Sequence, residues 1–366
     1  MYLVLYLFCA FIGSLFSGFI LLRIRQQLNG VSKPRDDGTA VQSSHVGNPL
    51  RLGGLAAVAG LAFAVALQML NEGESFAPLL LLSVLPVFIT GLAEDLGHHV
   101  SPRGRFLAAV FSGVAAVALL GVWVPKADIP GIDWAMATPA VAIILTVIFS
   151  AGFCHAVNLI DGMNGLAASV ITTSALGCAA IATLASLPAV TGFALLLVAA
   201  TIGFLFLNWP VARVFFGDAG AYGLGHLLVF LMFLLASLSS EVAVPALLLV
   251  IFWPLADVFH TILRRVADKV SITQPDRMHL HQKVRRTLDI VWFGYRGRYR
   301  SNPLTTIILL PFIIAPVVTG VLLWNNPGAA WFALGGYMLA FSACHPLTIR
   351  LARRFRRWTS YTRKSH

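Results

Sequence analysis

Charge is what this sequence has least of. Asp, Glu, Lys and Arg together make up 11% of its 366 residues, whereas 58% are hydrophobic. None of these four residue types occurs in 1–22, 52–71, 75–93, 106–125, 134–160, 162–212, 219–240 or 301–349. A transmembrane helix needs roughly 20 predominantly apolar residues. The pattern therefore excludes an ordinary water-soluble domain and predicts a polytopic membrane protein.

Cysteine is also scarce. The four cysteines, Cys9, Cys154, Cys178 and Cys344, lie in or at the ends of apolar stretches and show no CxxC spacing. This excludes a disulfide-stapled fold and a cysteine-based metal site. We expect these residues to behave as small buried hydrophobic side chains.

The uncharged stretches predict an all-α polytopic integral membrane protein with about eleven transmembrane helices. The expected helices cover 2–22, 52–70, 78–93, 106–124, 138–157, 166–186, 190–208, 219–238, 242–263, 303–323 and 329–349. We expect one membrane domain over 1–350, followed by a basic tail over 351–366. The first stretch has no positive residue ahead of it, which favours a retained span over a signal peptide.

The basic residues predict the orientation. With eleven spans and the N-terminus outside, every Lys and Arg except Lys126 lies on the side that holds the C-terminus. The positive-inside rule makes that side cytoplasmic. The net charge of +11 then predicts contact between the tail and anionic membrane lipids, and we expect no nucleic-acid partner.

Glu94 and Asp95 form an acidic pair at the inner end of the third expected helix. Adjacent carboxylates repel each other, so at least one tends to hold a proton or to need a cation. The pair is a candidate metal ligand or general base. The alternative is a solvated loop pair balanced by Arg103 and Arg105.

Asn158, Asp161 and Asn164 follow the fifth expected helix in the segment NLIDGMNG. On a helix, this spacing places the three side chains on one face. A carboxylate at the centre of a membrane helix costs about 2.5–3.5 kcal/mol, and less toward the interface. Short polar groups between apolar spans therefore favour ligand contact. The alternative is a polar helix cap with Asp161 in solvent.

Asp218 lies between glycines in the segment FGDAG, at a span boundary. There the backbone and the carboxylate can both approach a small anionic ligand and its metal. Mg²⁺ binds a few protein carboxylates and takes its remaining ligands from water and phosphate. Asp218 is the candidate metal ligand, with a plain turn as the alternative.

His279 and His281 lie in the long inner loop, in the segment QPDRMHLHQK. Together with Arg277 they could hold phosphate or sugar hydroxyls by charge-assisted hydrogen bonds. Zinc would require further ligands at the usual spacing, and the segment has none. The alternative is a polar loop. Asp257 and His260, near the end of the ninth expected helix, either brace the bundle or face the site.

All four clusters lie in cytoplasmic loops or at cytoplasmic helix ends, which indicates a single site. In order, they resemble the polyprenyl-phosphate N-acetylhexosamine-1-phosphate transferase superfamily, from about His45 to Lys283. HVGNPLRLGG resembles its first inner loop, GLAEDLG its paired-Asp segment, NLIDGMNGLAAS its NxxDGxDGLA segment, FFGDAGAYGLG its (M/F)GDxGS segment and QPDRMHLHQ its histidine loop, SPDRxHxHH. Glu94, Asn164 and Gln282 depart from these patterns. The departures bear on nucleotide and sugar preference more than on the reaction class.

The resemblance implies transfer of an N-acetylhexosamine 1-phosphate from a UDP-sugar to undecaprenyl phosphate or a similar polyprenyl phosphate. The products would be a polyprenyl-pyrophosphoryl-sugar and UMP, and the step would initiate a cell-envelope polysaccharide. It also implies a bacterial cytoplasmic (inner) membrane location, an active site on the cytoplasmic face and a homodimer.

The resemblance further implies roles for individual residues. Asp218 would be the principal ligand of Mg²⁺, with Mn²⁺ able to substitute, and Asp161 would line the reaction centre. Glu94 and Asp95 would deprotonate or orient the lipid phosphate. The remaining candidates are placed at the nucleotide, phosphate or sugar of the donor: Asn158, Asn164, Arg277, His279 and His281.

Two other hypotheses come from different classes. A secondary transporter would use carboxylates at the membrane midplane and paired repeats, whereas the acids here lie at the inner boundary and no paired repeat is evident. A membrane scaffold with a catalytically weakened site would be consistent with the three departures from the family patterns.

Overall fold

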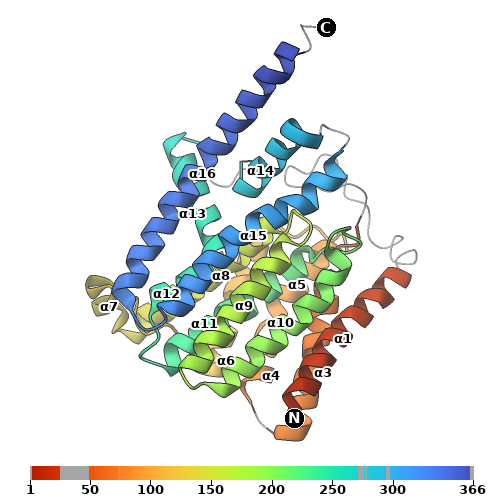
Figure 1. Cartoon of the computed structure of the whole chain (residues 1–366). Helices are drawn as coiled ribbons and strands as arrows, with labels where there is room; N and C mark the ends of the chain where they lie inside the picture. The colour runs from red at the N-terminus through yellow and green to blue at the C-terminus, as the bar shows by residue number, and fades with distance from the viewer. Residues whose placement is uncertain are drawn as a thin grey trace.

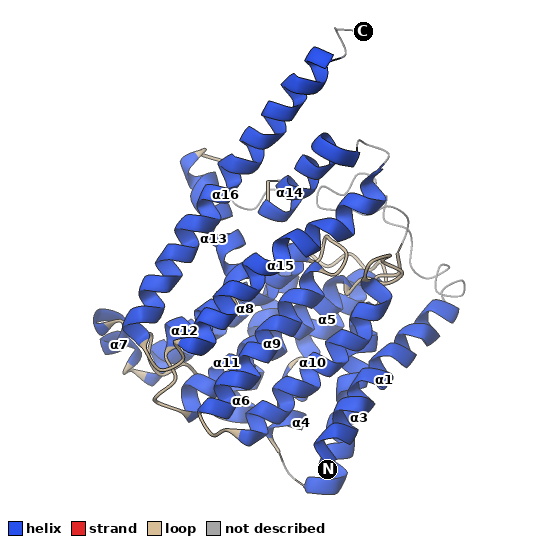
Figure 2. Ribbon diagram, in the orientation of Figure 1, coloured by secondary structure: helices blue, strands red, loops and turns tan. Residues whose placement is uncertain are grey.

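The chain folds as a bundle of helices. The computed structural model describes residues 2–24, 49–73, 75–270, 276, 278–293 and 297–362. Within these residues the only β-type pairing is one isolated bridge, between Leu50 and Val214, and no strand forms (Figure 2). The prediction of an all-α fold is confirmed.

Nine helices in the described part of the chain are long and apolar enough to cross a bilayer. They are α1 (Tyr2–Arg23), α3 (Gly53–Glu72), α6 (Pro102–Leu120), α8 (Pro139–Ile160), α9 (Leu166–Leu184), α10 (Pro188–Asn208), α11 (Gly217–Leu238), α15 (Arg298–Leu322) and α16 (Pro327–Thr362). Two bent pairs raise the number of candidate spans to eleven. The start of α1 and the end of α16 lie at opposite ends of the bundle (Figure 1), as an odd number of spans requires.

The bent pairs replace two of the expected single helices. The expected helix over 78–93 is α4 (Phe76–Ser83) followed by α5 (Leu85–Asp95), bent by 43°. The expected helix over 242–263 is α12 (Val244–Val250) followed by α13 (Phe252–Ala267), bent by 89°. The chain is a multi-pass membrane protein in which one of these spans turns by nearly a right angle.

Proline explains the sharper bend. Pro254 lies in the first turn of α13 and has no N–H to donate to the carbonyl of Val250, four residues earlier. The Ser174 hydroxyl donates to this carbonyl instead, at 2.7 Å. A buried carbonyl that loses its helical partner is thus satisfied from a neighbouring helix.

Helix α11 is the centre of the bundle. Every residue from Gly217 to Ala236 is buried, and α3, α5, α8 and α9 all pack against it. Glycines allow the closest of these contacts, because a Cβ added to Gly54 of α3 would lie 2.1 Å from the Cα of Gly220. The start of α3 therefore lies directly on the start of α11.

Two shorter helices complete the described part. Helix α7 (Pro130–Met136) lies at one end of the bundle, and α14 (Leu280–Leu288), with a π-helical turn over Asp289–Phe293, lies at the other. Helix α16 passes α14 and extends beyond the rest of the bundle (Figure 1).

Candidate active site

The loop ahead of α3 pairs with the loop ahead of α11. The Leu50 N–H donates to the Arg213 carbonyl at 3.2 Å, and the Phe215 N–H donates to the Leu50 carbonyl at 2.8 Å. One turn on, the Gly53 N–H donates to the Phe215 carbonyl at 2.7 Å. These backbone bonds place Arg51 beside the first residues of α11.

Asp95, the last residue of α5, binds the start of α11. Its carboxylate oxygens accept the backbone N–H groups of Asp218 and Ala219, each at 2.9 Å. The first N–H groups of a helix have no partner inside the helix and carry partial positive charge, so a carboxylate stabilises them. The acidic-pair and FGDAG motifs are thereby brought into direct contact.

Gly217 allows this contact. Its φ of +70° is a conformation that residues with side chains rarely adopt. A Cβ at this position would lie 2.0 Å from the Arg51 carbonyl oxygen and 2.5 Å from the Asp95 carboxylate. The glycine ahead of Asp218 therefore lets a neighbouring carboxylate approach the backbone.

Asp161 reaches the same point from α8. It is the residue immediately after that helix, and its Oδ2 accepts the Gly217 N–H at 3.2 Å. Burial raises the pKa of Asp161 well above its ordinary value, and the nearby Asp95 and Asp218 carboxylates raise it further, while Arg51 opposes them. Three of the predicted acidic residues thus converge on the N-terminus of α11.

Two arginines bind the carboxylate of Asp218. Nη2 of Arg51 lies 3.1 Å from Oδ1, and Nη1 of Arg105 lies 2.7 Å from Oδ2. Nε of Arg51 also lies 3.5 Å from Asp95 Oδ1. Sequence reasoning missed both roles, since it considered Arg105 only as a counter-charge for the acidic pair. The signal for Arg51 was its place just ahead of Gly53 in the first-loop segment.

Glu94 has different partners from Asp95. Its Oε2 accepts the Val100 N–H at 2.8 Å and so holds the loop between α5 and α6. The adjacent carboxylates therefore point to different parts of the structure, one to a loop and one to α11.

The prediction that Asn158, Asp161 and Asn164 stack on one face of a helix is wrong. That stacking required a continuous helix through Asn164, and the segment after α8 is not helical. Helix α8 ends at Ile160, so only Asn158 is helical; its side chain lies near the Tyr222 hydroxyl. Nδ2 of Asn164 donates to the Pro210 carbonyl at 2.8 Å. The three side chains diverge because the chain turns at Asp161, ahead of Gly162.

Asn164 is built into a junction between loops and helices. Its N–H donates to Oδ1 of Asn302 at 2.8 Å, and its carbonyl accepts from the Thr306 hydroxyl at 2.7 Å. Both partners belong to α15. The N–H, the carbonyl and Nδ2 of Asn164 thus already form hydrogen bonds. The expected nucleotide contact would have to use hydrogen-bonding capacity of Asn164 beyond these bonds.

The histidines form a second group. Nδ1 of His279 lies 2.7 Å from Oδ2 of Asp257, whose other oxygen accepts the Leu280 N–H at 3.3 Å. Both histidines are buried, and their rings lie 5.6 Å apart, nearly parallel. Asp257, whose role the sequence left open, therefore faces the histidines and orients one of them.

The pKa values of the two histidines are shifted in opposite directions. Burial favours the neutral form of His279, but the charge and hydrogen bond of Asp257 outweigh it and raise the pKa. Burial lowers the pKa of His281 to about 4. His279 is therefore the more readily charged of the two. Within the described residues, Nε2 of His279 and Nδ1 of His281 have no hydrogen-bond partner.

The residues ahead of α14 are held by an ion pair. Asp276 pairs with Arg264 of α13, and its Oδ1 accepts the Met278 N–H at 3.0 Å. Arg277, predicted to contact the donor, lies outside the described residues. Helix α15 contacts both α14 and the loop of Asn164, so it connects the histidine group with the acidic group.

The donor chemistry of the acidic group suits Mg²⁺. Asp95, Asp161 and Asp218 supply hard carboxylate oxygens. Burial, and to a smaller extent the neighbouring carboxylates, raise the pKa of Asp161, and a bound cation would oppose both effects. Within the described residues, no three His, Cys, Asp or Glu side chains are already arranged as a metal site. A metal at Asp218 would share that carboxylate with Arg51 and Arg105.

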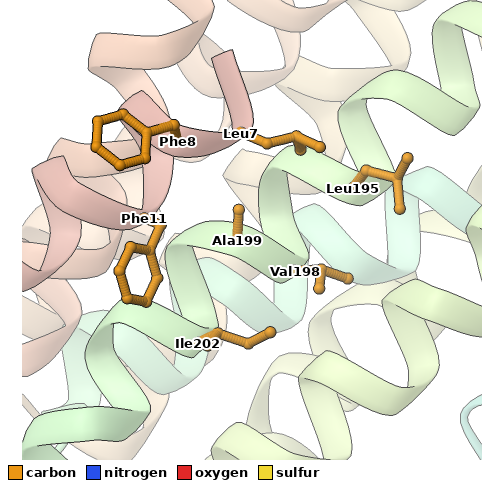
Figure 3. A pocket seen from close by; sticks show the side chains of 7 residues that line it. All are labelled: Leu7, Phe8, Phe11, Leu195, Val198, Ala199 and Ile202. Atoms are coloured by element: carbon orange, nitrogen blue, oxygen red, sulfur yellow. The ribbon is translucent and has the colours of Figure 1, made fainter. Parts of the chain in front are cut away.

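A groove on the outside of the bundle has a different character. It lies between α1 and α10 (Figure 3) and is lined only by apolar side chains. These are Leu7, Phe8, Phe11, Leu195, Val198, Ala199 and Ile202. Such a lining suits lipid hydrocarbon and offers nothing to a phosphate.

Comparison with known proteins shows which family this part of the chain resembles. Residues 77–236, which include the acidic pair, the turn after α8 and the start of α11, match the glycosyl transferase family 4 model. Over these residues the chain is similar to members of this family. Of the four free cysteines, Cys154 and Cys178 are buried as expected, whereas Cys9 and Cys344 are only partly buried.

Three curated relatives have related names. A probable undecaprenyl-phosphate N-acetylglucosaminyl 1-phosphate transferase of Bacillus subtilis (strain 168) is 28% identical over 64% of this chain and 65% of its own length, just under two thirds. A decaprenyl-phosphate N-acetylglucosaminephosphotransferase of Mycobacterium tuberculosis (strain CDC 1551 / Oshkosh) is 27% identical over 81% and 83%. An undecaprenyl-phosphate alpha-N-acetylglucosaminyl 1-phosphate transferase of Yersinia pestis is 24% identical over 95% and 92%.

Proposed function

We propose that the protein transfers an N-acetylhexosamine 1-phosphate from a UDP-sugar to a polyprenyl phosphate, giving a polyprenyl-pyrophosphoryl-sugar and UMP. The observation that carries this proposal is the pairing of Asp218 with Arg51 and Arg105 at the N-terminus of α11. Two arginines, a helix N-terminus and carboxylates at one point suit a pyrophosphate and its metal. The names of the relatives support the same reaction.

The reaction is a phosphoryl transfer. An oxygen of the acceptor phosphate attacks the β-phosphorus of the donor, and the bond from that phosphorus to the bridging oxygen breaks as UMP leaves. Negative charge accumulates on the transferred group and the leaving phosphate, so catalysis depends on positioning and charge stabilisation. Arg51 and Arg105 supply positive charge that stabilises this negative charge, and Asp95 holds the start of α11 in place.

Mg²⁺ bound through Asp218, or Mn²⁺ in its place, would neutralise the pyrophosphate and favour departure of UMP. Asp161 lines the reaction centre. The bonds of Asp95 to α11 and of Glu94 to the adjoining loop favour structural roles for this pair over the contact with the lipid phosphate that the resemblance implied. His279 and His281 contact the donor's phosphates or sugar, and Asp257 orients His279 and favours its charged form. Asn158 and Asn164 remain the candidates at the nucleotide.

The acidic residues lie at helix ends, which disfavours a transporter. Asp95 ends α5, Asp161 follows α8 and Asp218 is the second residue of α11. A transporter is expected to carry its carboxylates near the midplane of the bilayer. A site at a membrane surface instead suits one lipid and one soluble substrate. Because the basic residues gather at this end, we place it on the cytoplasmic face of the bacterial inner membrane.

A donor and acceptor panel tests the proposal. Purified protein in lipid nanodiscs would be given radiolabelled UDP-N-acetylhexosamines with undecaprenyl phosphate, and butanol-extractable label would be measured. We expect label in the lipid phase only when both substrates are present. Transport of label into sealed vesicles without a lipid product would contradict the proposal, as would no product from any donor. A homodimer, which the reaction does not require, can be tested on the same preparation by mass photometry.

A further inference from the structure

Three helices at the site end are joined by a closed set of side-chain contacts. Asp257 of α13 binds His279 at the start of α14, at 2.7 Å. Nζ of Lys283, in α14, lies 2.9 Å from Nδ1 of His345, in α16. The His345 ring in turn stacks on His260 of α13, with ring centroids 3.7 Å apart. The contacts therefore run from α13 to α14, to α16 and back to α13.

The spacing of these residues concentrates the contacts on single helix faces. The Lys283 N–H donates to the His279 carbonyl at 3.1 Å, so the two residues lie one helical turn apart on the same side. Asp257 and His260 are three residues apart and share a face of α13. Lys283 therefore lies on the same face of α14 as His279.

The contact between Lys283 and His345 is buried. Lys283 is 7% exposed and His345 is 4% exposed. A lysine ammonium can only donate, so Nδ1 of His345 must accept and the ring is neutral, with its hydrogen on Nε2. Burial, together with the charge of Arg264, lowers the pKa of Lys283. A buried ammonium without an acceptor is costly, so the hydrogen bond to His345 holds Lys283 in place.

A second contact between the same two helices lies one turn further on, where the Thr287 hydroxyl, which donates to the Lys283 carbonyl at 2.9 Å, is also 3.3 Å from the Thr348 carbonyl. Helix α14 has nine residues, too few to be stable by itself in water. Its position must therefore come from its neighbours, and α16 is the one to which Lys283 and Thr287 bind.

We infer that His345 is a positioning residue: by binding Lys283 it fixes α14 and thereby sets where His279 and His281 meet the donor. The inference rests on the proposed function, because only that function gives the histidines a donor to hold. Helix α16, which lies outside the matched residues 77–236, would then contribute to donor binding without touching the substrate.

The test compares two replacements of His345 with a control on the same helix. His345→Leu removes the acceptor, whereas His345→Asn keeps an oxygen close to the place of Nδ1. Tyr337→Phe removes a hydrogen bond between α15 and α16, from the Thr319–Tyr337 pair at 2.8 Å, away from α14. We expect His345→Leu to raise the KM for the UDP-sugar about tenfold, the scale of one lost buried hydrogen bond, and to change kcat less than about threefold. His345→Asn and Tyr337→Phe should stay within about threefold in both.

Hydrogen exchange gives a readout that does not depend on activity. Amide exchange over 280–288 should be faster in His345→Leu than in the unaltered protein, and unchanged in Tyr337→Phe. Lys283→Met should resemble His345→Leu, and the double variant should be no worse than either, because the two residues act through one contact.

The two readouts separate failure of the inference from failure of the proposed function. Faster exchange in a protein that makes no lipid product would support the attachment of α14 to α16 and contradict the proposed reaction. Normal exchange in His345→Leu would overturn the inference whatever the kinetics. So would faster exchange with an unchanged KM, or a fall in kcat at constant KM.

Discussion

Asp95 and Asp218 lie 123 positions apart in the sequence, yet the Asp95 carboxylate accepts the Asp218 N–H at 2.9 Å. This bond makes the end of α5 and the beginning of α11 one structural unit. The Asp218 side chain then points to Arg51 and Arg105. One carboxylate orders the backbone, and the other is left for the arginines and for a cation.

Asp218→Asn should reduce kcat by at least about 10²-fold while the protein remains folded. An amide has one acceptor oxygen where the carboxylate offers one to Arg51 and another to Arg105, and it is a weaker ligand for a hard cation. The measurement is lipid product per enzyme, with thermal unfolding as the control for folding. EDTA should abolish activity and Mg²⁺ or Mn²⁺ should restore it. Full activity in excess EDTA would remove the metal from the mechanism.

Asp95→Asn should be far more harmful than Glu94→Gln. The substitution leaves one acceptor oxygen at a position where two now bind the N–H groups of Asp218 and Ala219. We expect about a 10- to 100-fold loss of kcat for Asp95→Asn, as for a lost hydrogen bond to a charged group. Glu94→Gln keeps an oxygen for the Val100 N–H and should lose less than about threefold in the same product assay. Equal, large losses would mean that the pair acts together on the lipid phosphate.

Gly217→Ala should destabilise the site end of the bundle. The φ of +70° costs a side-chain-bearing residue about 1–3 kcal/mol, and the new Cβ would also meet the Arg51 carbonyl and the Asp95 carboxylate. Gly152→Ala is the matched control, because a Cβ there has no heavy atom within 4 Å. The unfolding temperature and product formation should both fall for Gly217→Ala alone. Similar behaviour of the two variants would show that the contact of Asp95 with α11 tolerates displacement.

Asp257→Asn should change the pH dependence of donor binding. The raised pKa of His279 means that its charge stabilises the folded protein fully below the unfolded value of about 6.5. This contribution is lost as the pH rises through the folded value. Replacing Asp257 lowers that value, so the basic limb of the kcat/KM profile should move to lower pH. Asp268→Asn, at a position with a 58% exposed side chain, is the control and should leave the profile unchanged. An unmoved limb in Asp257→Asn would exclude charged His279 from donor binding.

Much of the fold follows from hydropathy, because apolar length alone decides which segments can cross a bilayer. The bends do not, since the 89° turn before α13 depends on Pro254 and on a hydroxyl from Ser174 in another helix. Periodicity likewise suggested a helix through Asn164, whereas α8 ends at Ile160.

The acidic residues were found because they interrupt uncharged sequence. Their geometry could not be predicted, because it depends on contacts between distant segments. Arg51 reaches Asp218 through backbone pairing of the loops ahead of α3 and α11. His345 reaches Lys283 from α16, in an apolar stretch that gave no sign of the contact.

The most direct test of the proposed reaction follows the β-phosphorus of the donor. UDP-N-acetylhexosamine labelled with ³²P at the β position would be incubated with undecaprenyl phosphate and the protein, with Asp218→Asn as the low-activity control. Transfer of the sugar 1-phosphate predicts that the label enters the lipid fraction and that the released nucleotide is unlabelled UMP. Label retained in released UDP would show transfer of the sugar alone and would contradict the account.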